Sequence, residues 1–86
     1  MDWQDVRAHY PDRWLLVEAL VAHNDAERRV LDDIAVIDSF DDSHAAMARY
    51  ADLHRVAPGR ELYVVHSSRE SIDITERRWL GVRARR

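Results

Sequence analysis

The 86-residue chain has no cysteine and no lysine, and it contains only two glycines and two prolines. Without cysteine it can form no disulfide bond, no zinc–thiolate site and no catalytic thiol. Neither Gly59 nor Gly81 precedes a suitable helix, so there is no phosphate-binding glycine loop. No apolar run approaches the roughly 20 residues of a membrane-spanning helix. The length corresponds to one domain, residues 1–86, with room for a single thin core.

All thirteen basic residues are arginine, and the charges are unevenly distributed along the chain. Residues 1–76 carry all sixteen acidic residues and eight arginines, a formal charge of −8. Residues 77–86 carry five arginines and no acid, a formal charge of +5. The sequence therefore predicts an acidic body with a basic C-terminal arm at about 77–86. The acidic first residues are unlike the basic start of a signal peptide, and we expect a cytoplasmic protein.

The N-terminal third predicts a short helix followed by a core strand. Residues 2–10 suit a helix capped by Asp2 and ended by Pro11. A strand is expected from Trp14 to Val21, because apolar side chains occupy both alternating sets of positions. These sets are Leu15, Val17 and Ala19 on one face, and Trp14, Leu16 and Leu20 on the other. A strand that is apolar on both faces must be covered on both, by helices or by a partner.

The segment after residue 22 fits two assignments of secondary structure. Residues 23–26 are polar and suit a hairpin connection, and residues 34–37 form a buried strand. Residues 26–33 could extend that strand or form a helical turn, since Asn24 and Glu27 have capping-box spacing. We favour a long hairpin strand with a bulge near residues 32–33.

The C-terminal half predicts a helix and two more strands. Residues 41–43 start the helix, and residues 58–59 end it. Strands are expected at 61–67 and 72–74. The order predicts an α+β fold, in which a small, mainly antiparallel sheet of three to four strands with a ββαβ core carries the main helix on one face. The predicted fold also includes the short N-terminal helix. We expect the other sheet face to keep large apolar groups exposed, which is a motive for association.

The titratable residues do not form a recognisable catalytic or metal-binding motif. No two histidines have the spacing that places two ligands on one helix face. Glu18 lies within an apolar strand and suits a rim charge or a cross-strand partner for Arg28 or Arg29. Residues 66–68 combine histidine with serines, but we expect such close neighbours not to form a nucleophile–base hydrogen bond. The sequence therefore predicts no enzyme, no metal and no cofactor. An enzyme site built from His66, Glu18 and nearby carboxylates is kept as a hypothesis beside the two binding functions given below.

The arginine-rich arm allows three interpretations. It can be a solvated terminus, or it can bind nucleic acid with Trp79 stacking on a base. It can also bind an acidic protein surface, such as the acidic body of a second copy. The net charge of −3 disfavours nucleic acid, because the acidic body repels the phosphate backbone that the arm attracts.

Several runs resemble a family of small bacterial proteins that has no assigned activity. They are residues 10–20, 35–43, 49–54, 60–70 and 79–83, and together they span nearly the whole chain. The resemblance implies a gene placed beside that of a small retropepsin-like aspartic protease, in a module like a toxin–antitoxin pair. The chain itself has no Asp-Thr-Gly or Asp-Ser-Gly, so it is not the protease. The resemblance therefore implies a protein partner.

These observations lead to one functional hypothesis and one alternative. The first is a non-enzymatic protein–protein interaction module, antitoxin-like or homodimeric, that partners a neighbouring protein such as the protease. The alternative is a small nucleic-acid-binding regulator that uses the arginine arm. Neither requires a membrane or a small-molecule substrate. The predicted partner-binding residues are Trp14, Leu16, Arg77, Arg78, Trp79, Arg83, Arg85 and Arg86.

Overall fold

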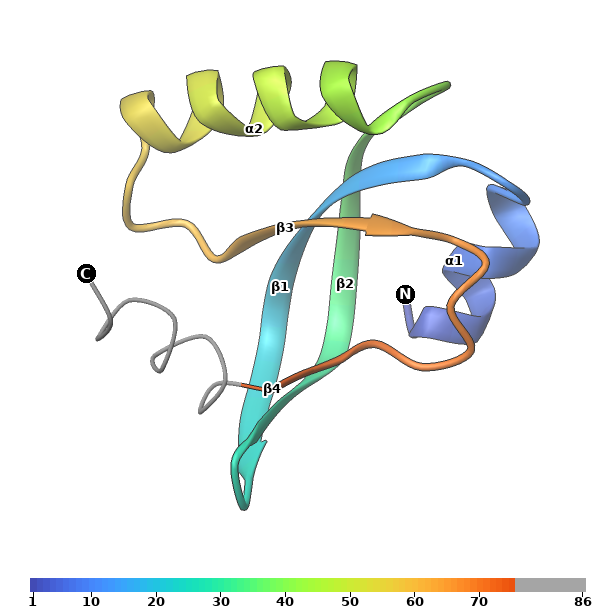
Figure 1. Ribbon diagram of the computed structural model, residues 1–86. Coiled ribbons are helices and arrows are strands. Elements are labelled where there is room, and N and C mark those ends of the chain that lie inside the picture. Colours follow the sequence, from blue (N-terminus) through green and yellow to red (C-terminus); the bar gives the residue numbers. More distant parts are fainter. Residues whose placement is uncertain (76–86) are drawn as a thin grey trace.

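The computed structural model describes residues 1–75, which form an α+β fold (Figure 1). The elements in chain order are α1 (Trp3–His9), β1 (Trp14–Asp25), β2 (Arg28–Phe40), α2 (Ser43–Val56), β3 (Leu62–His66) and β4 (Asp73–Thr75). All neighbouring strands are antiparallel, in the order β3-β1-β2-β4. The predicted fold class is confirmed. The predicted arginine arm at about 77–86 lies outside the described residues.

None of the helices in the part of the chain that the structure describes is long and apolar enough to span a membrane.

Both helices begin where the sequence places a capping aspartate. The Asp2 carboxylate accepts a hydrogen bond from the Asp5 backbone N–H at 2.9 Å, and Asp42 accepts one from Ala45 at 2.8 Å. Each cap satisfies a backbone donor that has no partner within the helix and places negative charge at the positive end of its dipole. The helix ends also agree with the sequence, since α1 stops before Pro11 and α2 before residues 58–59.

The open question at residues 26–33 is resolved in favour of a strand. β1 and β2 form a long hairpin joined at residues 26–27, so β1 continues four residues beyond the predicted end. Val21 pairs with Asp33 and Ala22 with Leu31, which leaves Asp32 as an extra residue and confirms the expected bulge. In the connecting turn Ala26 has φ 57°, a left-handed conformation reached without glycine.

The face of β1 that carries Leu15 and Val17 packs against α1. A single buried cluster joins these residues to Trp3 and Val6 of α1 and to side chains from the other elements. The whole cluster is Trp3, Val6, Leu15, Val17, Leu31, Ile34, Val65 and Ile72. The expectation that this second sheet face stays open is therefore wrong. α1 and the segment before β4 supply enough apolar surface to cover it.

The opposite face of the sheet is covered by α2, which packs against β3, β1 and β2. Figure 1 shows the two helices on different sides of the sheet. Leu16 and Leu62 are buried here, yet the only residue that α2 itself buries is Ala46. Two larger apolar side chains of α2 remain exposed, Met47 at 50% and Val56 at 76%. This layer is therefore thinner than the one under α1.

The buried cluster makes Leu15 a test of the fold. Leu15→Ala should lower the free energy of unfolding by about 3 kcal/mol, because the side chain has no exposed surface and its removal leaves a cavity. Leu20→Ala, at a position 55% exposed on the same strand, should cost under about 1 kcal/mol. Urea denaturation of both variants measures the difference. Equal losses would contradict the assignment of these two residues to core and surface.

Candidate functional site

Two of the residues predicted to bind a partner can be placed, and they differ in accessibility. Trp14 is half-buried at the start of β1, where its ring meets that of His66 edge to face with centroids 5.0 Å apart. Leu16 has no exposed surface, so it has nothing to offer a partner. The other six predicted residues, Arg77, Arg78, Trp79, Arg83, Arg85 and Arg86, lie outside the described part of the chain.

Glu18 has a different partner from the one that the sequence suggested. The expected pairing with Arg28 or Arg29 is wrong, because Arg60 donates two hydrogen bonds to the Glu18 carboxylate at 2.7 and 3.2 Å. Arg60 lies just before β3, and Glu18 is opposite the first residue of that strand, Leu62. The hydrogen bond from Arg60 and its positive charge lower the pKa of Glu18. Glu18 is thus a structural carboxylate at the junction of β1 and β3.

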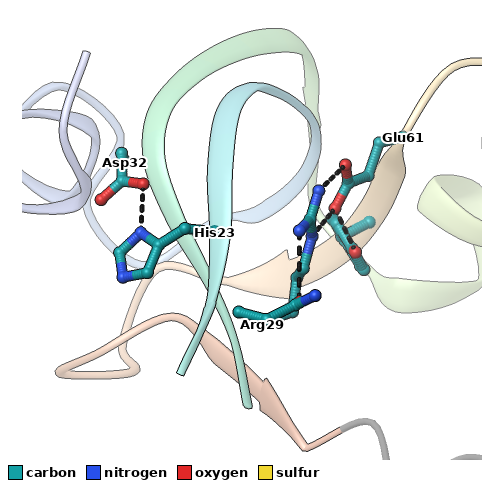
Figure 2. Close-up of polar contacts among 6 residues, drawn as sticks. His23, Arg29, Asp32 and Glu61 are labelled. Carbon is teal, nitrogen blue, oxygen red and sulfur yellow. Dashed lines mark hydrogen bonds and ion pairs between the residues drawn. The ribbon is translucent and has the colours of Figure 1, made fainter. Parts of the chain in front are cut away.

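Arg29 instead forms a bridge to Glu61, drawn in Figure 2. Its guanidinium donates to both carboxylate oxygens at 2.9 and 3.0 Å, and the Tyr63 hydroxyl donates to the same carboxylate at 2.7 Å. Because β1 lies between β2 and β3, the Arg29 side chain must cross β1 to reach Glu61. Arg29 also donates to Asn24 at 3.2 Å. The hydrogen bonds from Arg29 and then Tyr63 lower the pKa of Glu61.

A second polar pair, also in Figure 2, joins His23 of β1 to the bulged Asp32 of β2. The His23 Nδ1 lies 2.6 Å from the Asp32 carboxylate, and both side chains are exposed. His23 lines an open groove of about 410 Å³ that also contains Trp3 and Ser71. No hydrogen bond joins His23 to Ser71, so this groove lacks the contact between nucleophile and base that activates a serine. No cluster of three metal-ligating residues exists among residues 1–75.

The expectation that His66 forms no hydrogen bond with its neighbouring serines is wrong. Ser68 does hydrogen-bond to the ring, with its Oγ 2.9 Å from Nδ1, because the turn after β3 folds back. The Ser68 backbone N–H donates to the same Nδ1 at 3.1 Å, so this nitrogen is an acceptor engaged in holding the turn. The opposite ring nitrogen lies 3.7 Å from the exposed Asp12 carboxylate. This arrangement is typical of a turn whose side chains bond to its own backbone.

The outer edge of β3 is the feature that the sequence analysis missed. Ser67 donates its backbone N–H to Arg13, and Ala19 donates to Glu61, so odd-numbered residues of this segment face β1. Since backbone groups alternate in an antiparallel pair, the N–H and C=O groups of Leu62 and Val64 face away from the sheet. No strand among residues 1–75 pairs with them. The edge therefore presents unpaired donors and acceptors.

The residues of β3 do nothing to protect this edge. Leu62–His66 contains no proline, no acidic residue and no arginine, and its register with β1 has no bulge. Natural sheets usually block such edges with charge, proline or a bulge. Elsewhere in the sheet the exposed part of β1, with Leu20 and Val21, is bulged, and the edge of β2 is covered in part by β4 and by Met1.

The pairing of Arg29 with Glu61 predicts acid sensitivity. A lowered pKa in the folded state means that the stabilisation is fully present above the ordinary value of 4.5 and is lost as pH falls through the folded value. Glu61→Gln should cost about 1 kcal/mol at neutral pH and nothing once the wild-type carboxylate is protonated. Thermal unfolding across the acid range measures this convergence. The exposed Glu70→Gln variant is the control, and a constant gap for Glu61→Gln at every pH would contradict the prediction.

Comparison with protein-family models, with curated proteins and with solved structures found no match to this chain. The resemblance to a bacterial family encoded beside a protease therefore stays a prediction.

Proposed function

We propose that this protein is a non-enzymatic protein–protein interaction module that binds an extended segment of its partner along the outer edge of β3. The observation that carries the proposal is that the backbone N–H and C=O groups of Leu62 and Val64 face outward and have no partner strand among residues 1–75. A peptide that adds to a sheet edge gains its affinity from main-chain hydrogen bonds, and neighbouring side chains select its sequence.

The side chains around the edge support this mode of binding. Val64 is half-buried and faces the same side of the sheet as Leu16 and α2, whereas Tyr63 faces the side of Val17. A strand added beside β3 would therefore place alternate side chains near α2 and near Tyr63. The Trp14 ring and His66 lie at one end of this edge, so Trp14 keeps its proposed role as a partner contact.

The polar clusters support a structural rather than a catalytic interpretation. Glu18 and Glu61 are each held by an arginine, and His66 is held by its own turn. The partner is a second copy of the chain or the product of an adjacent gene, such as a retropepsin-like protease in a cytoplasmic two-gene module. The adjacent gene product is suggested by the sequence resemblance alone. The alternative, a nucleic-acid regulator, concerns residues 77–86 and likewise rests on sequence.

The edge can be blocked by one substitution that removes no hydrogen bond inside the protein. The Val64 N–H faces outward, so Val64→Pro deletes a donor that only a partner can use, as proline does on natural edge strands. We expect Val64→Pro to weaken the complex that uses this edge, whether with a second copy or with the adjacent gene product, at least about tenfold by calorimetry. Val64→Thr keeps the donor and a β-branched shape, and it should bind like the wild type.

Two further measurements keep this test decisive. Thermal unfolding of Val64→Pro must show a cooperative transition, so that lost binding is not lost folding. In the wild type, hydrogen exchange at the Leu62 and Val64 amides should slow on binding, which needs no variant at all. Unchanged exchange at both amides in a formed complex would show that the partner binds elsewhere.

A further inference from the structure

We infer that the segment that occupies the β3 edge is β3 of a second copy, paired antiparallel about a two-fold axis at Val64. This inference rests on the proposed function and adds the identity of the partner. The pairing would join two four-stranded sheets into one continuous sheet of eight strands. A two-fold dimer uses the same patch on both copies, so the edge has to be complementary to itself.

The register about Val64 satisfies that requirement. It places Val64 opposite Val64 of the other copy, Leu62 opposite His66, and Tyr63 opposite Val65. Val64 pairs with its own equivalent as a hydrogen-bonded pair, because its N–H and C=O both face outward. The His66 carbonyl already accepts from Arg69 at 3.2 Å, and its second lone pair remains for Leu62.

Charge also favours this register. The pairs that follow on either side place Glu61 opposite Ser67 and Arg60 opposite Ser68, so no like charges meet. Arg60 is already neutralised by Glu18 of its own chain. Moving the axis to Leu62 would bring Pro58 into the ladder, where it has no N–H to donate. Moving it to His66 would require residues 67–70, which turn away from the sheet.

α2 supplies the additional apolar surface that a five-residue edge lacks. Figure 1 shows α2 running alongside β3, and α2 packs over β3 and β1. Relative to the buried Ala46, Met47 lies about 100° to one side and Val56 about 80° to the other by helix geometry. One of these exposed side chains therefore lies on the flank of α2 towards the β3 edge. In the dimer the two α2 helices lie on the same face of the joined sheet, where that flank meets its equivalent.

The other exposed part of the sheet is a weaker candidate for self-pairing. Leu20 and Val21 of β1 are 55% and 56% exposed, but register shifts on both sides of Val21 twist this edge. A bulge is one of the devices that prevent strand addition. β3 has a continuous register with β1 instead, so its outer edge is the better suited of the two to strand addition.

The first test uses the absence of cysteine from the natural chain. Val64→Cys would place the two thiols across a hydrogen-bonded pair whose Cα atoms are about 5.5 Å apart, within disulfide range. Under mild oxidation Val64→Cys should form the disulfide-linked dimer at least about tenfold faster than Leu20→Cys, the exposed control on β1. Equal rates for the two variants would overturn the inference.

The second test measures mass in solution. Light scattering across about a hundredfold range of concentration should show the wild type and Val64→Thr approaching twice the mass of one chain. Val64→Pro should keep the mass of one chain at every concentration. A wild type that stays monomeric at the highest concentration would also overturn the inference.

These outcomes separate the inference from the proposed function. A monomeric protein whose adjacent-gene complex depends on Val64 means that another protein occupies the edge, so the proposed function stands and the inference fails. A dimer that Val64→Pro leaves intact means that the copies meet elsewhere, which also defeats the inference. If Val64→Pro changes neither self-association nor any complex, both the inference and the proposed function fail.

Discussion

The structure depends on the burial of β1 from four directions at once. β2 and β3 pair with its two edges, while Leu15 and Val17 face α1 and Leu16 faces α2. A strand in this position contributes more hydrophobic free energy to folding than any other, and it loses part of that free energy if any neighbouring element is missing. Apart from β4, which pairs with β2, each element packs on a face or an edge of β1. β3 uses its inner edge to cover β1, and its outer edge has no partner strand among residues 1–75.

Local features of the sequence predicted the elements well. Asp2 and Asp42 sit where a helix needs acceptors, and the two-sided apolar pattern of β1 implied a strand covered on both faces. The bulge at Asp32 could also be predicted, because two adjacent acids interrupt an apolar strand. All of these signals act between residues close in the chain, where the geometry of helix and strand is fixed.

The strand order could not be predicted, and the errors follow from that. Arg28 and Arg29 are the arginines across the hairpin from β1, so they were the natural partners for Glu18. The true partner, Arg60, comes beside Glu18 only because β3 inserts on the other edge of β1. The covering of the second face has the same origin, since Trp3 packs with Ile72 from the far end of the described chain. The candidate binding edge was missed because no residue of β3 marks it as peripheral.

The ion pairs link the two halves of the sheet in complementary ways. Glu18 of β1 is held by the arginine before β3, and the glutamate before β3, Glu61, is held by Arg29 of β2. Because the second pair spans β1, it ties the far end of the hairpin to the start of β3. The two contacts hold the chain as it enters β3, while the ladder with β1 determines which backbone groups of β3 face outward. Within residues 1–75, these two ion pairs hold the backbone that leads into β3 against β1 and β2.

The turn at Ala26 has a consequence for how the chain reaches this structure. Two-residue hairpin turns form readily when glycine or asparagine occupies the left-handed position. Alanine is disfavoured there, because its Cβ comes too close to the following carbonyl oxygen. The turn is therefore a poor nucleus, and the hairpin has to be closed by contacts distant in sequence. We expect the ladder to form first at the end that contains the Trp14–Phe40 and Val17–Val36 pairs, and to reach the turn last. The tip of the hairpin would then also be the first part to open during native-state fluctuations.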